Sequence, residues 1–138
     1  NALGNKGASI LAASQTIEEL NLDQNGIDHL CAVPHIQNLR LFNNQITSQG
    51  VEDLSGNESL NSLDLSFNNL DERCLSVLAN VKNLTALSIT DNLMDSHSEV
   101  FRKALLKAFD EKSKLKCLEL DGRKIDCTQE PNNKKVKV

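Results

Sequence analysis

The chain has 138 residues and a net charge of −4 at pH 7, and 39% of its residues are apolar. This length predicts one domain, and the acidic balance argues against a nucleic-acid partner, which would require a basic stripe on the surface. No apolar run approaches the roughly 18 residues of a membrane-spanning helix, so no membrane partner is expected.

One spacing of residues recurs five times along the chain: apolar-x-x-Leu-x-Leu-x-x-Asn-x-apolar, with Ile once in place of the second Leu. Recurrence of such a spacing is the sequence signature of a repeat architecture. Within each copy, the alternating Leu-x-Leu core predicts a short strand with its leucines turned inward. The copies run over residues 17–27, 36–46, 60–70, 84–94 and 115–125, with Asn25, Asn44, Asn68, Asn92 and finally Arg123 in the asparagine position.

This pattern predicts a leucine-rich repeat solenoid over residues 1–127. Its fold class would be α/β: a right-handed horseshoe with a parallel sheet on the concave side and mostly helices on the convex side. Counting back 24 residues from Asn25 places Asn1 in the same slot. We therefore expect the chain to begin in the middle of a repeat, with upstream sequence missing.

The segments between the predicted strands differ in length. Helices are predicted over residues 4–13, 47–55 and 71–80, whereas Pro34 argues against a helix over 26–35, where an irregular or 3₁₀ connection is expected. The longest segment predicts a helix over 96–111, which begins with a capping box formed by Ser96 and Glu99. The apolar face of that helix would consist of Val100, Ala104, Leu105, Ala108 and Phe109.

The end of each predicted strand carries the repeated asparagine. Its amide both donates and accepts hydrogen bonds, so it can satisfy backbone groups that the turn leaves unpaired. Arg123 cannot accept a hydrogen bond, so the fifth turn should deviate and form a terminal cap. Residues 128–138 are polar and basic, and we predict a disordered tail there.

The four cysteines bear on the cellular compartment. Cys31 and Cys74 occupy the same slot two units apart, which places them about 10 Å from each other and beyond the about 7 Å limit for a disulfide. The spacing leaves a pair of Cys117 and Cys127 undecided. Without the cysteine-stapled caps of extracellular repeat proteins, we predict four free thiols in a reducing cytosol.

The residues beside the inward leucines would point outward and form a polar, mostly acidic face. Arg40 and Phe42 are the predicted anchor, because arginine and aromatic side chains are over-represented among binding hot spots. Three alternatives stay open: Phe42 folds back over the turn and packs, as Phe67 is expected to do; Arg40 only neutralises Asp64; or the face is merely solvated. The predicted partner-binding residues are Glu19, Asn21, Asp23, Asn38, Arg40, Phe42, Asp64, Ser66, Ser88, Thr90, Glu119 and Asp121.

Signals for catalysis, metals and cofactors are weak. His29, Cys31 and His35 are ligand types at close spacing, with Asp28 beside them, but a structural zinc site would need a second ligand pair. His97, near a predicted helix start, is expected to be exposed. The chain has neither a phosphate-binding loop nor a dinucleotide fingerprint. We therefore predict no catalytic residue, no metal, no cofactor and no small-molecule substrate, and a protein that is not an enzyme.

The first twelve residues carry a resemblance. The segment Asn-x-Leu-Gly-Asn-Lys-Gly-Ala-x-x-Leu-Ala resembles the ribonuclease-inhibitor-like class of leucine-rich repeats. Cytosolic inhibitors, the sensing halves of innate immune receptors and repeat effectors of intracellular bacteria share that class. The uneven units of 19, 24, 24 and 31 residues depart from the vertebrate inhibitor pattern and look more like the bacterial effectors.

The resemblance implies a module that binds or inhibits another protein through the concave face, in the cytosol or after secretion into that of a host cell. It also leaves two other functions open. The chain could be the targeting domain of a larger enzyme, such as a ubiquitin ligase or a toxin, whose catalytic part lies elsewhere. Alternatively, the long helix over 96–111 rather than the sheet could dock a partner.

Overall fold

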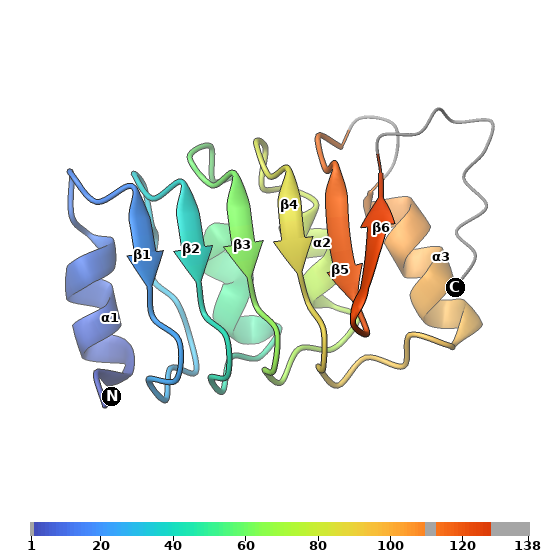
Figure 1. Ribbon diagram of the computed structural model, residues 1–138, viewed down its shortest axis with the longest axis horizontal. Helices are drawn as coiled ribbons and strands as arrows, with labels where there is room; N and C mark the ends of the chain where they lie inside the picture. The colour runs from blue at the N-terminus through green and yellow to red at the C-terminus, as the bar shows by residue number, and fades with distance from the viewer. Residues whose placement is uncertain (1, 110–112, 128–138) are drawn as a thin grey trace.

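The structure, a computed structural model, describes residues 2–109 and 113–127. The chain advances from strand to strand in sequence order, from the N-terminal helix to a terminal hairpin (Figure 1). The elements are α1 (Gly4–Ala12), β1 (Glu19–Asn21), β2 (Asn38–Arg40), the 3₁₀ helix η1 (Gln49–Leu54), β3 (Ser62–Asp64), α2 (Cys74–Leu78), β4 (Ala86–Ser88), α3 (Glu99–Ala108), β5 (Cys117–Leu120) and β6 (Arg123–Asp126).

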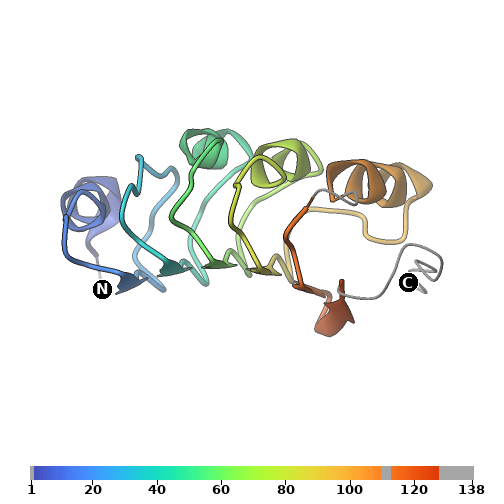
Figure 2. The same cartoon turned by 90° about the horizontal axis from the view of Figure 1, so that it is seen from above.

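The six strands form one sheet in the order β1-β2-β3-β4-β5-β6. The pairs from β1 to β5 are parallel, as the repeat pattern predicts, and their central leucines lie in register. Helices and connections cover one face of this sheet, and no helix of the described residues covers the other face (Figure 2). Repeats stacked in this way form a solenoid of the α/β class, while the horseshoe curvature and its right hand remain predictions.

The core is a ladder of equivalent aliphatic side chains between the sheet and the helical layer. Leu39, Leu63 and Leu87 are each at most 2% exposed, because each stacks between the same residues of neighbouring repeats. Leu20, the equivalent residue of β1, is only half-buried, since β1 has a strand on one side alone. Packing therefore depends on both neighbours.

The repeated asparagines bond backbone groups, which confirms the role predicted for their amides. The Oδ1 of Asn68 accepts from the N–H of Ile46 at 2.9 Å, and its Nδ2 donates to the carbonyls of Leu41, Leu65 and Ser66. Asn44 and Asn92 make equivalent bonds. Each asparagine thus joins its own repeat to the preceding one.

The residue before each asparagine has a left-handed backbone. Gln24, Asn43, Phe67 and Asp91 have φ values of 58°, 53°, 56° and 52°. Asparagine and aspartate tolerate this conformation, whereas a bulky side chain there is unusual. Phe67 is therefore the exception among four equivalent turns.

Two of the predicted helices are shorter or tighter than expected. The segment 47–55 forms the 3₁₀ helix η1 rather than an α-helix, and α2 covers only five residues of the segment 71–80. The preceding connection between strands, over residues 26–35, contains no helix, as Pro34 predicts. Gly50 of η1 packs against that connection so closely that an added Cβ would lie 2.3 Å from the carbonyl oxygen of Asp28.

The start of α3 differs from the prediction. Ser98, not Ser96, is its N-cap, and the Ser98 hydroxyl accepts from the N–H of Phe101 at 3.0 Å. Ser96 is buried ahead of the helix, and the predicted capping box with Glu99 does not form. The described helix ends at Ala108, and the predicted end at residue 111 lies outside the described residues.

The predicted apolar face of α3 is wrong at one position. Val100 is 72% exposed, whereas Phe101, which the prediction left out, is fully buried. The later cap at Ser98 sets the helix phase so that Phe101 and Leu105 face the core. His97 is exposed, as predicted.

The last strand corrects the prediction of a wholly parallel sheet. β6 is antiparallel to β5, because a tight turn with positive φ at Asp121 and Gly122 reverses the chain at once. Arg123 begins β6 instead of closing a repeat turn, which confirms that the fifth turn deviates. The predicted tail over 128–138 lies outside the described residues.

Cys31, Cys74 and Cys117 are free cysteines, as predicted. In the described ranges, no helix is long and apolar enough to cross a membrane.

Candidate functional site

The sheet face away from the helices carries the predicted partner-binding residues, and we call it the exposed sheet face. Two columns of side chains on it follow the strand register, and a third follows the strand ends. The columns are Glu19, Asn38, Ser62, Ala86 and Cys117; Asn21, Arg40, Asp64, Ser88 and Glu119; and Asp23, Phe42, Ser66, Thr90 and Asp121.

Arg40 pairs with Asp23 rather than with Asp64. The Arg40 guanidinium lies 2.9 Å from Asp23 Oδ2, and the other oxygen of Asp23 accepts from the backbone N–H of Phe42 at 2.8 Å. One oxygen of the Asp64 carboxylate instead accepts from the N–H of Ser66, two residues further along the chain and beyond the end of β3. The predicted neutralisation of Asp64 by Arg40 is therefore wrong.

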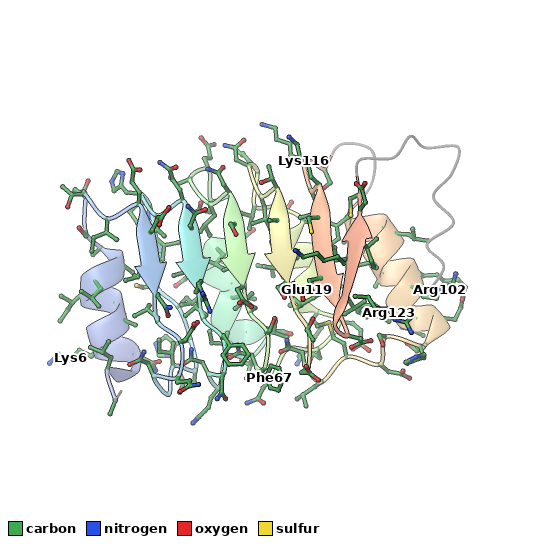
Figure 3. The ribbon with its side chains drawn as sticks, viewed as in Figure 1. Lys6, Phe67, Arg102, Lys116, Glu119 and Arg123 are labelled. Carbon is green, nitrogen blue, oxygen red and sulfur yellow. The ribbon has the colours of Figure 1, made fainter. Side chains whose placement is uncertain are left out.

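Phe42 and Phe67 form an aromatic pair at the end of the exposed sheet face. Their ring centroids lie 5.0 Å apart with the planes tilted by 58°, a favoured geometry for aromatic contacts. Phe42 is half-buried, whereas Phe67 is 47% exposed beside the strand ends (Figure 3). Phe42 therefore packs, as one of the alternatives expected, but it packs against Phe67, which is itself exposed to solvent.

Sequence reasoning left Phe67 out of the partner-binding residues. It follows Ser66 in a turn where side chains were expected to pack back. A signal was available, because the equivalent residues of the other repeats, Gln24, Asn43 and Asp91, are all polar. An aromatic in a slot that otherwise holds polar residues is a candidate contact.

Small side chains occupy the middle of the exposed sheet face. The hydroxyls of Ser66 and Ser88 lie 2.7 Å apart, and Ser62 and Ala86 stand beside them on β3 and β4. The Thr90 hydroxyl accepts from the N–H of Gly122 at 3.4 Å, which ties this region to the terminal hairpin. These small side chains therefore lie between the anchor residues on one side and Glu119 on the other.

The predicted partner-binding residues include five carboxylates and one guanidinium, a net charge of −4. Asp23 forms an ion pair with Arg40, and the Glu19 carboxylate accepts a hydrogen bond from the Asn38 amide at 3.1 Å. Glu119 faces Lys124 across the β5–β6 pair, but no ion pair forms between them within the described residues. Among the residues that the structure describes, the carboxylates of Asp64 and Glu119 on the exposed sheet face thus form no ion pair.

Groups with shifted pKa values lie elsewhere and have structural surroundings. Burial raises the pKa of the Cys74 thiol to about 12, which leaves it protonated at neutral pH. Hydrogen bonds from His29 and Asn5 lower the pKa of the Asp28 carboxyl. In the described ranges, no group of three His, Cys, Asp or Glu side chains is placed to hold a metal ion.

An open polar recess of about 450 Å³ lies on the loops before the strands, where Glu18, His35 and Glu58 are among its lining residues. The ammonium of Lys82 already pairs with Glu58 and lowers the pKa of that carboxyl. Among its described lining residues, the recess brings together no further group of reactive or metal-binding side chains. The exposed sheet face is therefore the better candidate site.

Comparison with known families agrees with the repeat register. A family model of the leucine-rich repeat matches residues 34–55 and 56–79, which contain β2 with η1 and β3 with α2. No curated protein matches the chain. The two matched segments are similar to leucine-rich repeats, and they carry Arg40, Phe42, Asp64 and Phe67 of the candidate site.

Proposed function

We propose that the protein is a binding module that holds another protein on its exposed sheet face. Leucine-rich repeats generally mediate contacts between proteins, and solenoids do so through extended surfaces. The observation that carries the proposal is the aromatic pair of Phe42 and Phe67 beside Arg40. Aromatic and arginine side chains dominate the binding energy of protein interfaces.

The proposed activity is binding rather than catalysis. The two groups with the largest pKa shifts, Asp71 and Cys74, contact Ser48 and Arg73 on the helical side and serve the packing of the repeats. The exposed sheet face offers instead a spread of polar and aromatic contacts. We therefore assign no reaction to the described residues.

In its most concrete form, the proposal is that the protein inhibits or regulates its partner, as the bacterial repeat effectors it resembles do. The cytosol, including that of a host cell, is the proposed location. The free cysteines Cys31, Cys74 and Cys117 support a reducing compartment.

The test compares two exposed apolar side chains of equal accessibility on opposite sides of the molecule. Phe67 is 47% exposed on the sheet side, and Leu106 is 48% exposed on α3. The wild-type protein, Phe67→Asn and Leu106→Gln would be used as baits in cell lysates, and captured proteins would be quantified by mass spectrometry. Circular dichroism would first confirm that each bait is folded.

The proposal expects a protein that wild type and Leu106→Gln capture equally and that Phe67→Asn loses. Purified, this protein should then bind wild type directly. Loss with Leu106→Gln and retention with Phe67→Asn would move the binding surface to α3 and overturn the proposal.

A further inference from the structure

We propose that the partner segment presents an aliphatic or aromatic side chain next to two lysine or arginine side chains. The apolar side chain would lie on the Phe42–Phe67 pair, and the cations would face the carboxylates of Asp64 and Glu119. This inference rests on the proposed function and specifies the chemistry of the partner.

The charges of the exposed sheet face favour a cationic partner. One oxygen of Asp64 accepts from the N–H of Ser66, and the other has no partner in the described part of the chain. The carboxylate of Glu119, on β5 (Figure 3), has neither a hydrogen bond nor an ion pair there, and only the backbone carbonyl of Glu119 accepts, from the N–H of Ile89. A lysine or arginine brought to either carboxylate would form a charge-assisted hydrogen bond that the free protein lacks.

The position of Arg40 divides the face into an apolar end and an anionic centre. Its guanidinium stands on β2 next to Asp64 in the register and is already bound to Asp23. A second cation over β2 would meet this like charge. The partner's apolar side chain is therefore placed over β2, where Phe42 lies, and its cations over β3 and β5.

The aromatic pair offers the apolar contact. Phe67 keeps 47% of its surface in solvent although its backbone has a φ of 56°, a conformation that disfavours bulky residues. Its ring packs on Phe42 and presents one side outward. Covering that side with an apolar group would remove more surface from water than at any other aromatic of the exposed sheet face.

The register sets the spacing of the two cations. Asp64 and Glu119 stand in one column with Ser88 between them, so two strand steps of about 4.8 Å separate their backbones. A segment in the polyproline II conformation rises by about 3.1 Å per residue with three residues per turn, so positions i and i+3 lie on the same side, about 9.3 Å apart. Cations at positions i and i+3 of such a segment crossing the strands would therefore match the two carboxylates.

The test uses synthetic nine-residue peptides with a fluorescent label. The lead peptide carries Trp next to one Lys, with a second Lys three residues after the first and Gly and Ser elsewhere. Comparison peptides place the second Lys directly beside the first, replace both Lys by Glu, replace both by Ser, or replace Trp by Ala, and each is made in both chain directions. Anisotropy titrations would measure affinity, and amide chemical shifts would locate the bound peptide.

The paired variant Asp64→Asn, Glu119→Gln removes the two carboxylates. Its matched control is Glu52→Gln, Asp53→Asn, which removes two exposed carboxylates from η1 on the helical side. We expect the lead peptide to bind wild type and the control at least about five-fold more tightly than the paired variant. This preference should shrink between about 50 mM and 500 mM salt, where exposed charges are screened. Replacing Trp by Ala should weaken binding to wild type but not to Phe67→Asn.

Peptides with Ser or Glu flanks that bind the exposed sheet face as tightly as the lead peptide would overturn the proposed chemistry and leave the binding surface in place. Binding that maps to α1, α2 or α3 would overturn both. Failure of every peptide to bind would overturn the partner chemistry alone, because the proposed function is tested with a whole protein partner.

Discussion

The carboxylate of Asp23 binds the guanidinium of Arg40 at 2.9 Å across the β1–β2 step. The same carboxylate accepts from the backbone N–H of Phe42. One acidic side chain of the first complete repeat therefore orients both residues predicted as the anchor, which belong to the second. Only 17% of the Asp23 side chain is exposed, against 60% of that of Arg40, so Asp23 is the fixed member of the pair.

A double-mutant cycle with Asp23→Asn and Arg40→Gln should show a coupling free energy of about 0.2 to 1 kcal/mol, as for other ion pairs open to water. Asparagine still accepts from Phe42, so the cycle isolates the charge interaction. Urea unfolding of the four proteins measures it at low and high salt. A coupling that is absent, or that does not fall with salt, would show that the pair does not persist in solution.

Phe67→Asn should change the free energy of unfolding by no more than about 1 kcal/mol in either direction. Loss of the ring contact with Phe42 destabilises the protein by about 0.5 to 1.5 kcal/mol, while relief of the left-handed backbone strain returns a similar amount. Chemical denaturation measures the net effect.

Phe101→Ala is the comparison for Phe67, because Phe101 is fully buried. It should cost about 3 to 5 kcal/mol. If Phe67→Asn instead destabilised the protein by more than about 2 kcal/mol, Phe67 would be a packing residue and its part in the binding surface would be in doubt.

Asn68→Ala should destabilise the protein by about 2 to 3 kcal/mol. The change leaves the buried N–H of Ile46 and three carbonyls without their side-chain partner, and each unsatisfied buried group is costly. Asn69→Ala is the matched control, since Asn69 is exposed and should matter by less than about 0.5 kcal/mol. Equal thermal stabilities of the two variants would contradict the structural role of the repeated asparagine.

The stability of the protein should depend on Asp71 in acid. The guanidinium of Arg73, helped by the Ser48 hydroxyl, holds the pKa of the Asp71 carboxyl far below its ordinary value of 3.8. A lowered folded-state pKa means that the contribution is complete above the unfolded value and is lost as pH falls below it. Unfolding free energies from pH 6 down to about 2 should therefore fall less steeply in Asp71→Asn than in wild type. Parallel curves would argue against this contact in solution.

The repeat spacing alone predicted the strands, their inward leucines and the role of the asparagines. These features follow from a period that every copy shares, so five copies support one another. The irregular return over 26–35 was also predictable, because Pro34 acts locally. The outward columns followed from alternation along each strand.

What the sequence did not reveal depends on contacts between particular residues. The spacing alone does not distinguish Ser98 from Ser96 as the cap of α3, and only the structure shows that the Ser98 hydroxyl accepts from the N–H of Phe101. Arg40 forms its ion pair with Asp23 rather than with Asp64. The strand register does not predict this, because it fixes the backbone positions and not the direction in which the long arginine side chain extends. The reversal at Gly122 arises from one turn, and it replaces a repeat unit with a hairpin.

The asparagine bonds between neighbouring repeats imply that the array can be lengthened. Asn68 accepts a hydrogen bond from Ile46 of the repeat before it, and Asn92 accepts one from Leu70 of the repeat that contains Asn68. The β2–β3 and β3–β4 pairs have the same register. A duplicated 24-residue unit inserted between them would find the bonding groups it needs on both sides. Both ends of the molecule would keep their present neighbours, and only the distance from the aromatic pair to the terminal hairpin would grow. Each duplicated repeat would lengthen the exposed sheet face by one strand.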